Sequence, residues 1–121
     1  MNMIMPIRVF YFLRQNNRSP VEEYLVTIND RRQIAAIQAV IEKLVENNGR
    51  LPRPNAAHVD GKIWELRTRF GNRIFYCIQD GADIILLGGC TKKRDQIETR
   101  VLERMKNLYE EYLWEKKRKL Y

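Results

Sequence analysis

The feature that most constrains the fold is a series of three short apolar runs in the second half of the chain. The runs are Lys62–Phe70, Asn72–Gln79 and Asp83–Cys90. Each is rich in β-branched and aromatic residues, which favour strands. The breaks between them, Gly71-Asn72 and Asp80-Gly81, are dipeptides typical of tight turns. This pattern predicts an antiparallel meander of three strands.

Side chains alternate in type along the first two of these strands, which predicts a sheet with two different faces. One face carries the large apolar residues Trp64, Leu66, Phe70, Ile74, Tyr76 and Ile78. The other face carries Glu65, Arg67, Arg69, Arg73, Phe75 and Cys77. Antiparallel sheets commonly bury one face and leave the other in water. We therefore expect a packed side, with Trp64 in the core, and an open side that bears the arginines.

The chain before the meander predicts one more strand and two helices. Residues Ile7–Leu13 have strand composition. Ser19 is placed to cap a helix whose first residue is Pro20. A second helix is expected to start near Asp30 and to end at Asn48-Gly49, and its apolar residues recur on one stripe.

The remaining segments complete a small α+β domain. The stretch LPRPNAAHVDG, residues 51–61, is expected to be a loop, because two prolines and a closing Asp-Gly disfavour strand pairing. From Asp95 onward, an apolar stripe predicts a last helix. The predicted order is β-α-α-β-β-β-α, in one domain over residues 1–121, with an antiparallel sheet packed on a helical hairpin.

Cysteine usage and hydropathy indicate a cytoplasmic protein without a metal site. If the meander is right, Cys77 and Cys90 are farther apart than the roughly 7 Å between Cα atoms that a disulfide allows, so both should be free thiols. They have no CxxC spacing and a single histidine, His58, to join them, so we expect no metal and no cofactor. No window approaches the roughly 18 apolar residues of a membrane span.

The charge balance is compatible with a polyanionic partner. The chain has 22 Lys+Arg against 15 Asp+Glu, a net charge of +7. The excess is densest from Arg50 to Asp95, where nine basic residues face five acidic ones. A positive field of this kind attracts nucleic acid. A soluble basic protein with no such partner is an equally good interpretation of charge alone.

The chemistry that the sequence offers is cationic. Arg67, Arg69 and Arg73 lie on adjacent predicted strands, and the segment Lys92-Lys93-Arg94 ends the last one. With a tight turn at Gly71-Asn72, these side chains should converge on one concave patch. Such a patch suits RNA cleavage by internal transesterification, in which cations stabilise the charge that builds on the phosphate. The alternative is that a solvated sheet face simply carries arginines.

The same reaction needs proton transfer. A lysine whose pKa is lowered by its cationic neighbours, or Glu65, could serve as the general base. His58 is interpreted as a loop residue rather than a catalyst.

The segment Ile63–Lys93, IWELRTRFGNRIFYCIQDGADIILLGGCTKK, resembles the phage-derived HigB-like branch of the RelE/ParE toxin superfamily. The shared features are a WELR strand, an RIFY strand, a DG turn and an apolar strand that ends in Lys-Lys. The resemblance implies a RelE-like fold and the toxin of a type II toxin–antitoxin system. Such a toxin is a metal-independent, ribosome-dependent mRNA endonuclease, and its partners are the ribosome, mRNA and a helix-turn-helix antitoxin.

The resemblance also implies which residues act on RNA. By position, the catalytic residues are Arg67, Arg73, Lys92 and Lys93. The RNA-binding residues are expected to be Arg69, Lys62, Arg94 and Phe75.

The sequence departs from the family pattern in its aromatic residues. Cys90-Thr91 stands where a phenylalanine is expected, and Arg94-Asp95-Gln96 offers no tyrosine or histidine to stack on a base. Phe75 could substitute, although a role in the core is as well supported. Two other functions therefore stay open: a non-catalytic relative that binds RNA or the ribosome, and a ParE-like inhibitor of DNA gyrase. The Tyr109-Tyr112-Trp114 cluster is either the edge of the core or a docking surface for the antitoxin.

Overall fold

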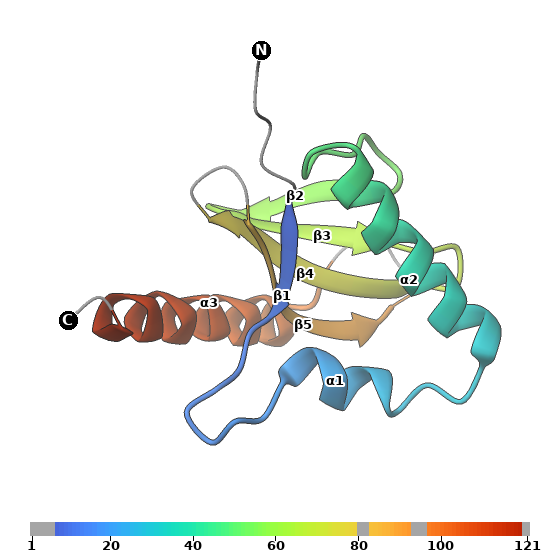
Figure 1. Ribbon diagram of the computed structural model, residues 1–121. Coiled ribbons are helices and arrows are strands. Elements are labelled where there is room, and N and C mark those ends of the chain that lie inside the picture. Colours follow the sequence, from blue (N-terminus) through green and yellow to red (C-terminus); the bar gives the residue numbers. More distant parts are fainter. Residues whose placement is uncertain (1–6, 80–82, 93–96, 120–121) are drawn as a thin grey trace, which may run out of the picture.

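The computed structural model describes residues 7–79, 83–92 and 97–119 as a five-stranded sheet with three helices (Figure 1). The elements are β1 (Arg8–Tyr11), α1 (Pro20–Leu25), α2 (Arg31–Glu46), β2 (Ala56–Asp60), β3 (Ile63–Arg67), β4 (Asn72–Gln79), β5 (Asp83–Thr91) and α3 (Thr99–Lys119). The α+β class is confirmed. None of the helices in these ranges is long and apolar enough to cross a membrane.

The predicted meander is the centre of the sheet, whose strand order is β1-β5-β4-β3-β2. Strands β3, β4 and β5 are antiparallel neighbours, and Arg67 lies opposite Arg73 across the first turn. Strand β1, however, pairs with β5 in parallel. The sheet is therefore mixed, and the prediction of an antiparallel sheet is wrong for this strand.

Strand β2 lies inside residues 51–61, for which the sequence predicts a loop, so that prediction is wrong for residues 56–60. Both prolines, at positions 52 and 54, precede the strand, which begins at Ala56. The turn of the β2–β3 hairpin is Gly61-Lys62, directly after Asp60, which pairs with Ile63, and Gly61 has a φ of 53°, which favours glycine. The turn signal was therefore real, but it joined two strands.

Helices cover both faces of the sheet, so the expected open face is wrong. Leu66, Ile74 and Tyr76 pack with residues of α1 and α2 in one core cluster. Phe75, Cys77 and Leu87 face the other way and pack with Met105, Leu108 and Tyr112 of α3 in a second cluster. In β4, this face carries Phe75 and Cys77 as well as Arg73, and an apolar surface of this kind is buried against another element.

Two aromatic predictions need correction at the margins of this sheet. Trp64 is 39% exposed and is not in the core; its ring instead lies edge-on to His58, with 5.1 Å between centroids. Phe70 lies beyond the end of β3, which stops at Arg67, so the alternation of that strand does not set its direction.

The helix starts agree with the sequence. Ser19 caps α1, its Oγ accepting from the backbone N of Glu22 at 3.1 Å, and Pro20 is the first helical residue. Asp30 caps α2. Helix α3 begins at Thr99; the residues expected to begin it, 95 and 96, lie outside the described ranges. Cys77 and Cys90 are both free, as predicted.

Two adjacent glycines let helices on opposite faces approach β5. A Cβ on Gly88 would lie 3.0 Å from Met105 Sδ, and a Cβ on Gly89 would lie 2.3 Å from Tyr24 Cδ2. Because no real Cβ sits at 2.3 Å from a ring carbon, Gly89 is what allows Tyr24 to lie flat on the strand. Its hydroxyl then reaches Thr91 Oγ1 at 2.7 Å, at the end of β5.

Candidate functional site

A cleft of about 740 Å³ opens at the end of the sheet where the β3–β4 turn, the end of β5 and the start of α2 meet. Four of the predicted cationic residues line it: Arg67, Arg69, Arg73 and Lys92. They come from β3, from the turn, from β4 and from the residue after β5. The convergence expected from the tight turn is therefore present.

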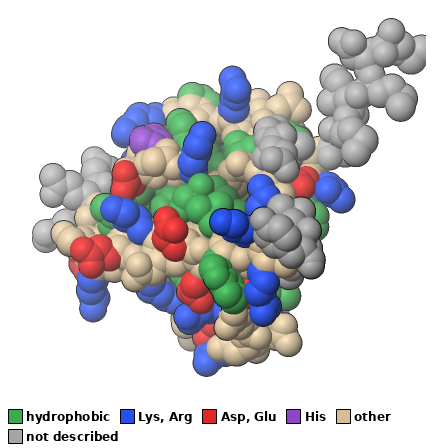
Figure 2. Space-filling model, turned by 90° about the vertical axis from the view of Figure 1, so that its left-hand side faces the viewer, with side chains coloured by type: hydrophobic (Ala, Val, Ile, Leu, Met, Phe, Trp, Pro, Cys, Tyr) green, Lys and Arg blue, Asp and Glu red, His purple; other side chains and the backbone are tan. Residues whose placement is uncertain are grey.

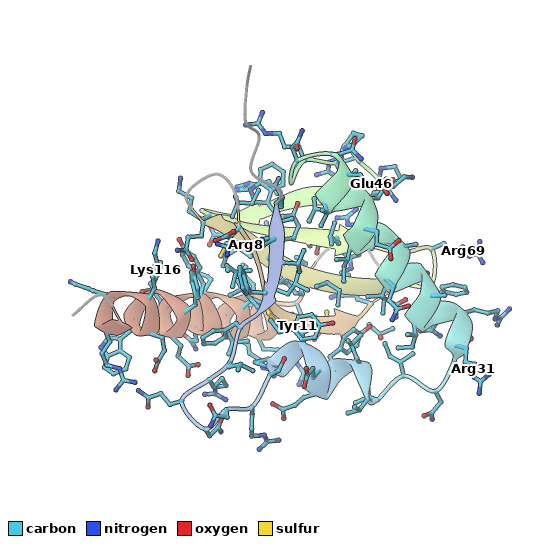
Figure 3. All side chains as sticks on the ribbon, in the orientation of Figure 1. Arg8, Tyr11, Arg31, Glu46, Arg69 and Lys116 are labelled. Atoms are coloured by element: carbon cyan, nitrogen blue, oxygen red, sulfur yellow. The ribbon has the colours of Figure 1, made fainter. Side chains whose placement is uncertain are left out.

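The cleft lies on one side of the molecule. Figure 3 shows Arg69 on the same side as Arg31 of α2, with Lys116 of α3 on the opposite side. The face in Figure 2, which is seen from that opposite side, carries Lys and Arg side chains interspersed with Asp and Glu. Mixed charges of this kind are ordinary for a solvated surface.

The innermost part of the site is an ion-paired triad. Glu65 is 1% exposed, and its Oε1 accepts from Arg67 Nε and from Arg73 Nη1, each at 2.7 Å. Arg73 is 4% exposed, whereas the Arg67 side chain is 18% exposed and reaches the cleft. Buried charges require such pairing. The carboxylate thus fixes the direction of both guanidinium groups.

This triad does not fit Glu65 as a general base. A base must be within hydrogen-bond reach of the substrate hydroxyl, and Glu65 is closed off from solvent with two guanidinium groups on one oxygen. Its role is to position the arginines. Cys90 lies opposite Arg73 in the sheet. Burial raises the pKa of its thiol, which disfavours a thiolate nucleophile at this position.

The β3–β4 turn is fixed by its own polar groups. Thr68 Oγ1 donates to Asn72 Oδ1 at 2.6 Å, and the backbone N of Thr68 donates to the carbonyl of Asn72 at 3.1 Å. Gly71 takes a φ of 86° and accepts a 2.6 Å hydrogen bond from the backbone N of Lys92. The turn and the end of β5 are therefore held together, which keeps Lys92 beside Gly71 at the rim of the cleft.

The side of the cleft next to the helices is built from neutral polar groups that no local pattern in the sequence brings together. Asn72 Nδ2 donates to Tyr24 Oη at 3.0 Å and to Gln33 Oε1 at 2.9 Å. The Tyr24 hydroxyl in turn contacts Thr91. This network joins α1, α2, β4 and β5, so it fixes the position of the two helices relative to the arginines and Lys92 that line the cleft.

Phe70 is the main residue of the cleft that sequence reasoning missed. Its ring is half-buried in the cleft, 4.8 Å from Arg69 Cζ and 5.8 Å from Arg32 Cζ. The signal that could have placed it was the Gly71-Asn72 turn, since a residue directly before that turn need not follow the alternation of the strand.

The other predicted site residues lie elsewhere. Lys62 is exposed at the opposite end of β3, in a separate hollow with Arg50 and Trp64. Phe75 is 0% exposed in the core on the α3 side of the sheet, so its ring has no surface on which a base could stack. The RNA-binding role predicted for Phe75 is therefore wrong, and its alternative role in the core is confirmed. Lys93 and Arg94 lie outside the described residues.

The mixed sheet, the helices on its two faces and the cationic cleft define an α+β domain compatible with a RelE-like fold. A family model described as Phage derived protein Gp49-like (DUF891) matches residues 23–110, well over half of the chain. The protein therefore belongs to this family, which is RelE/toxin-like. The matched range contains α2, all of β2–β5 and every described residue that lines the cleft. A comparison with curated proteins found no match.

Proposed function

We propose that the protein is the toxin of a type II toxin–antitoxin system and cleaves mRNA on the ribosome without a metal or cofactor. One observation carries the proposal: Arg67, Arg69, Arg73 and Lys92 meet in a single cleft, and buried Glu65 orients two of them. Membership of a phage-derived, RelE/toxin-like family supports it. Action on the ribosome would place the protein in the cytoplasm, with a helix-turn-helix antitoxin as its partner.

The proposed reaction is internal transesterification. The ribose 2′ oxygen bonds to the adjacent phosphorus, and the bond from phosphorus to the 5′ oxygen breaks. The hydroxyl loses its proton to solvent, and the leaving oxygen gains one. The products are a 2′,3′-cyclic phosphate and a 5′-hydroxyl. Charge builds on the phosphate oxygens in the transition state, and preorganised cations at that position are worth several kcal/mol.

The cleft residues divide this work by exposure and by chemistry. Arg67 is held by Glu65 but reaches the cleft, so it is the guanidinium suited to the phosphate oxygens. Arg73 is almost fully buried and acts through Glu65 as a positioning residue. Arginine does not lose its proton in proteins. Of the four cations, Lys92 is thus the one that can protonate the leaving oxygen.

The proposal is tested with purified protein, translating ribosomes and a defined mRNA, with cuts mapped by primer extension. Arg67→Ala and Lys92→Ala should each slow cutting by about 100-fold, the usual contribution of one acid–base or charge-stabilising group. Lys106→Ala is the matched control, since Lys106 is an exposed lysine of α3 that pairs with Asp60. Its rate should equal that of the wild type.

Two results would contradict the proposal. Wild-type protein that binds ribosomes but leaves the mRNA intact would favour a non-catalytic relative. Cutting that survives unchanged in both cleft variants would show that the chemistry occurs elsewhere.

A further inference from the structure

We propose that Phe70, flanked by Arg69 and Arg32, is a stacking platform for one unpaired RNA base next to the bond that is cut. The inference rests on the proposed function, and it adds the element that reads or holds the base.

The first support is the way the turn presents the ring. Phe70 lies between Thr68 and Gly71, whose hydrogen bonds close the turn, and its own backbone N donates to Thr68 Oγ1 at 3.3 Å. Phenylalanine is usually buried in a core, and a ring left in an exposed turn adds little to the stability of the fold. Here it is only half-buried, in the cleft and outside both core clusters. The turn therefore holds the ring in the cleft, and the ring contributes to neither core cluster.

The second support is the pair of cations beside the ring. Arg69 comes from the same turn, whereas Arg32 comes from the first turn of α2. Asp30, the cap of α2, accepts from Arg32 Nη2 at 3.2 Å and so directs a side chain that is 76% exposed. Both arginine side chains are long and exposed, so either guanidinium group can move aside or stack on the far side of an inserted base.

The third support is what surrounds the ring in the cleft. Arg67, proposed to bind the phosphate oxygens, and Lys92, proposed to protonate the leaving oxygen, line the same cleft. Aromatic and guanidinium planes next to backbone-binding cations are the combination by which proteins hold single-stranded RNA. A purely phosphate-binding cleft would need the cations but not the ring. A protein partner would bury the ring but would not need the two arginines beside it and further cations in the same cleft.

The test uses the full-length protein and a short single-stranded RNA that carries one 2-aminopurine and 2′-O-methyl groups, which prevent cutting. Stacking quenches 2-aminopurine fluorescence, so the signal reports the ring and not the charge. Wild-type protein should quench the probe. Phe70→Leu should lose the quenching and bind about tenfold more weakly, and Phe70→Trp should restore both.

The matched control is Phe10→Leu. Phe10 is an exposed phenylalanine of β1 with Arg8 Cζ 5.2 Å from its ring centroid, and it lies outside the cleft. Quenching and affinity should not change in this variant. Circular dichroism and the melting temperature establish that each variant is folded.

The outcomes separate this inference from the proposed function. If Phe70→Leu quenches and binds like the wild type, or if the wild type does not quench, the stacking platform is refuted even when ribosomal cutting is normal. If quenching depends on Phe70 but the wild type cuts no mRNA, the platform stands and the nuclease proposal fails. Weaker binding of Phe70→Leu with unchanged quenching would also refute the platform, since it would indicate a purely steric effect.

Discussion

Replacing Glu65 by glutamine should destabilise the fold far more than an ordinary surface substitution. Glu65 and Arg73 are 1% and 4% exposed, and the carboxylate also holds Arg67. Glutamine keeps the size and one acceptor oxygen but removes the negative charge that pairs with the buried Arg73 guanidinium at Nη1. Breaking a buried pair in this way typically costs about 3–5 kcal/mol.

The structure places this variant near the lower end of that range. The Arg67 side chain is 18% exposed and can rehydrate, and the glutamine oxygen can still accept a hydrogen bond. We expect a loss of about 3 kcal/mol in the free energy of unfolding and a fall of roughly 10–15 °C in the melting temperature. At pH 7, urea unfolding followed by circular dichroism measures the free energy of unfolding, and thermal unfolding followed by the same signal measures the melting temperature.

Two further variants isolate the cause. Glu23→Gln removes the carboxylate of an exposed pair with Arg18 and should cost less than about 1 kcal/mol. Adding Arg73→Met to Glu65→Gln removes the buried cation as well and should recover at least about 1.5 kcal/mol, a coupling that independent sites do not show. If Glu65→Gln costs no more than Glu23→Gln, or if Arg73→Met recovers nothing, the buried triad does not organise the site as described.

Three other perturbations give separate expectations. Gly89→Ala must move Tyr24, whose Cδ2 would lie 2.3 Å from the new Cβ, so it should cost about 1–3 kcal/mol in urea unfolding and loosen the Tyr24–Thr91 contact. Burial raises the pKa of Cys77 to about 12, so the thiol should react with a disulfide reagent at pH 8 far more slowly in the native than in the urea-unfolded protein. The same shift lowers stability as pH rises above about 9, where the unfolded thiol ionises and the native one does not, and the loss continues to about pH 12; Cys77→Ala should flatten that slope, and an unchanged slope would contradict the assignment. Removing one cation of the cleft by Arg69→Ala should reduce the salt dependence of RNA binding by about one ion, whereas an unchanged slope would exclude Arg69 from the RNA contact.

The centre of the fold could be predicted from the sequence because its signals are local. Alternation with a period of two and the turn dipeptides place β3, β4 and β5, and they bring Arg67 opposite Arg73. Strand β2 was missed because its signal is short and follows two prolines. The parallel pairing of β1 with β5 joins residues about 75 positions apart, and local patterns do not encode such a contact.

The candidate site was predictable only in part for the same reason. A tight turn brings cations from neighbouring strands together, so the meeting of Arg67, Arg73 and Lys92 follows from the hairpin pattern. Which face a helix covers depends on the whole fold, so the burial of Phe75 beneath α3 and the burial of Arg73 against Glu65 could not be predicted. The meeting of Arg32 with Phe70 depends on where α2 crosses the sheet, and alternation along β3 pointed Phe70 the wrong way.

The central claim is that clustered cations in this cleft cut RNA through its own 2′-hydroxyl. The most direct measurement is the chemistry of the new ends when purified protein acts on mRNA in translating ribosomes. The account predicts a 2′,3′-cyclic phosphate and a 5′-hydroxyl, and no cut where a single 2′-deoxy nucleotide replaces the attacking ribose. A new 3′-hydroxyl end, or cutting that persists at the deoxy position, would contradict it.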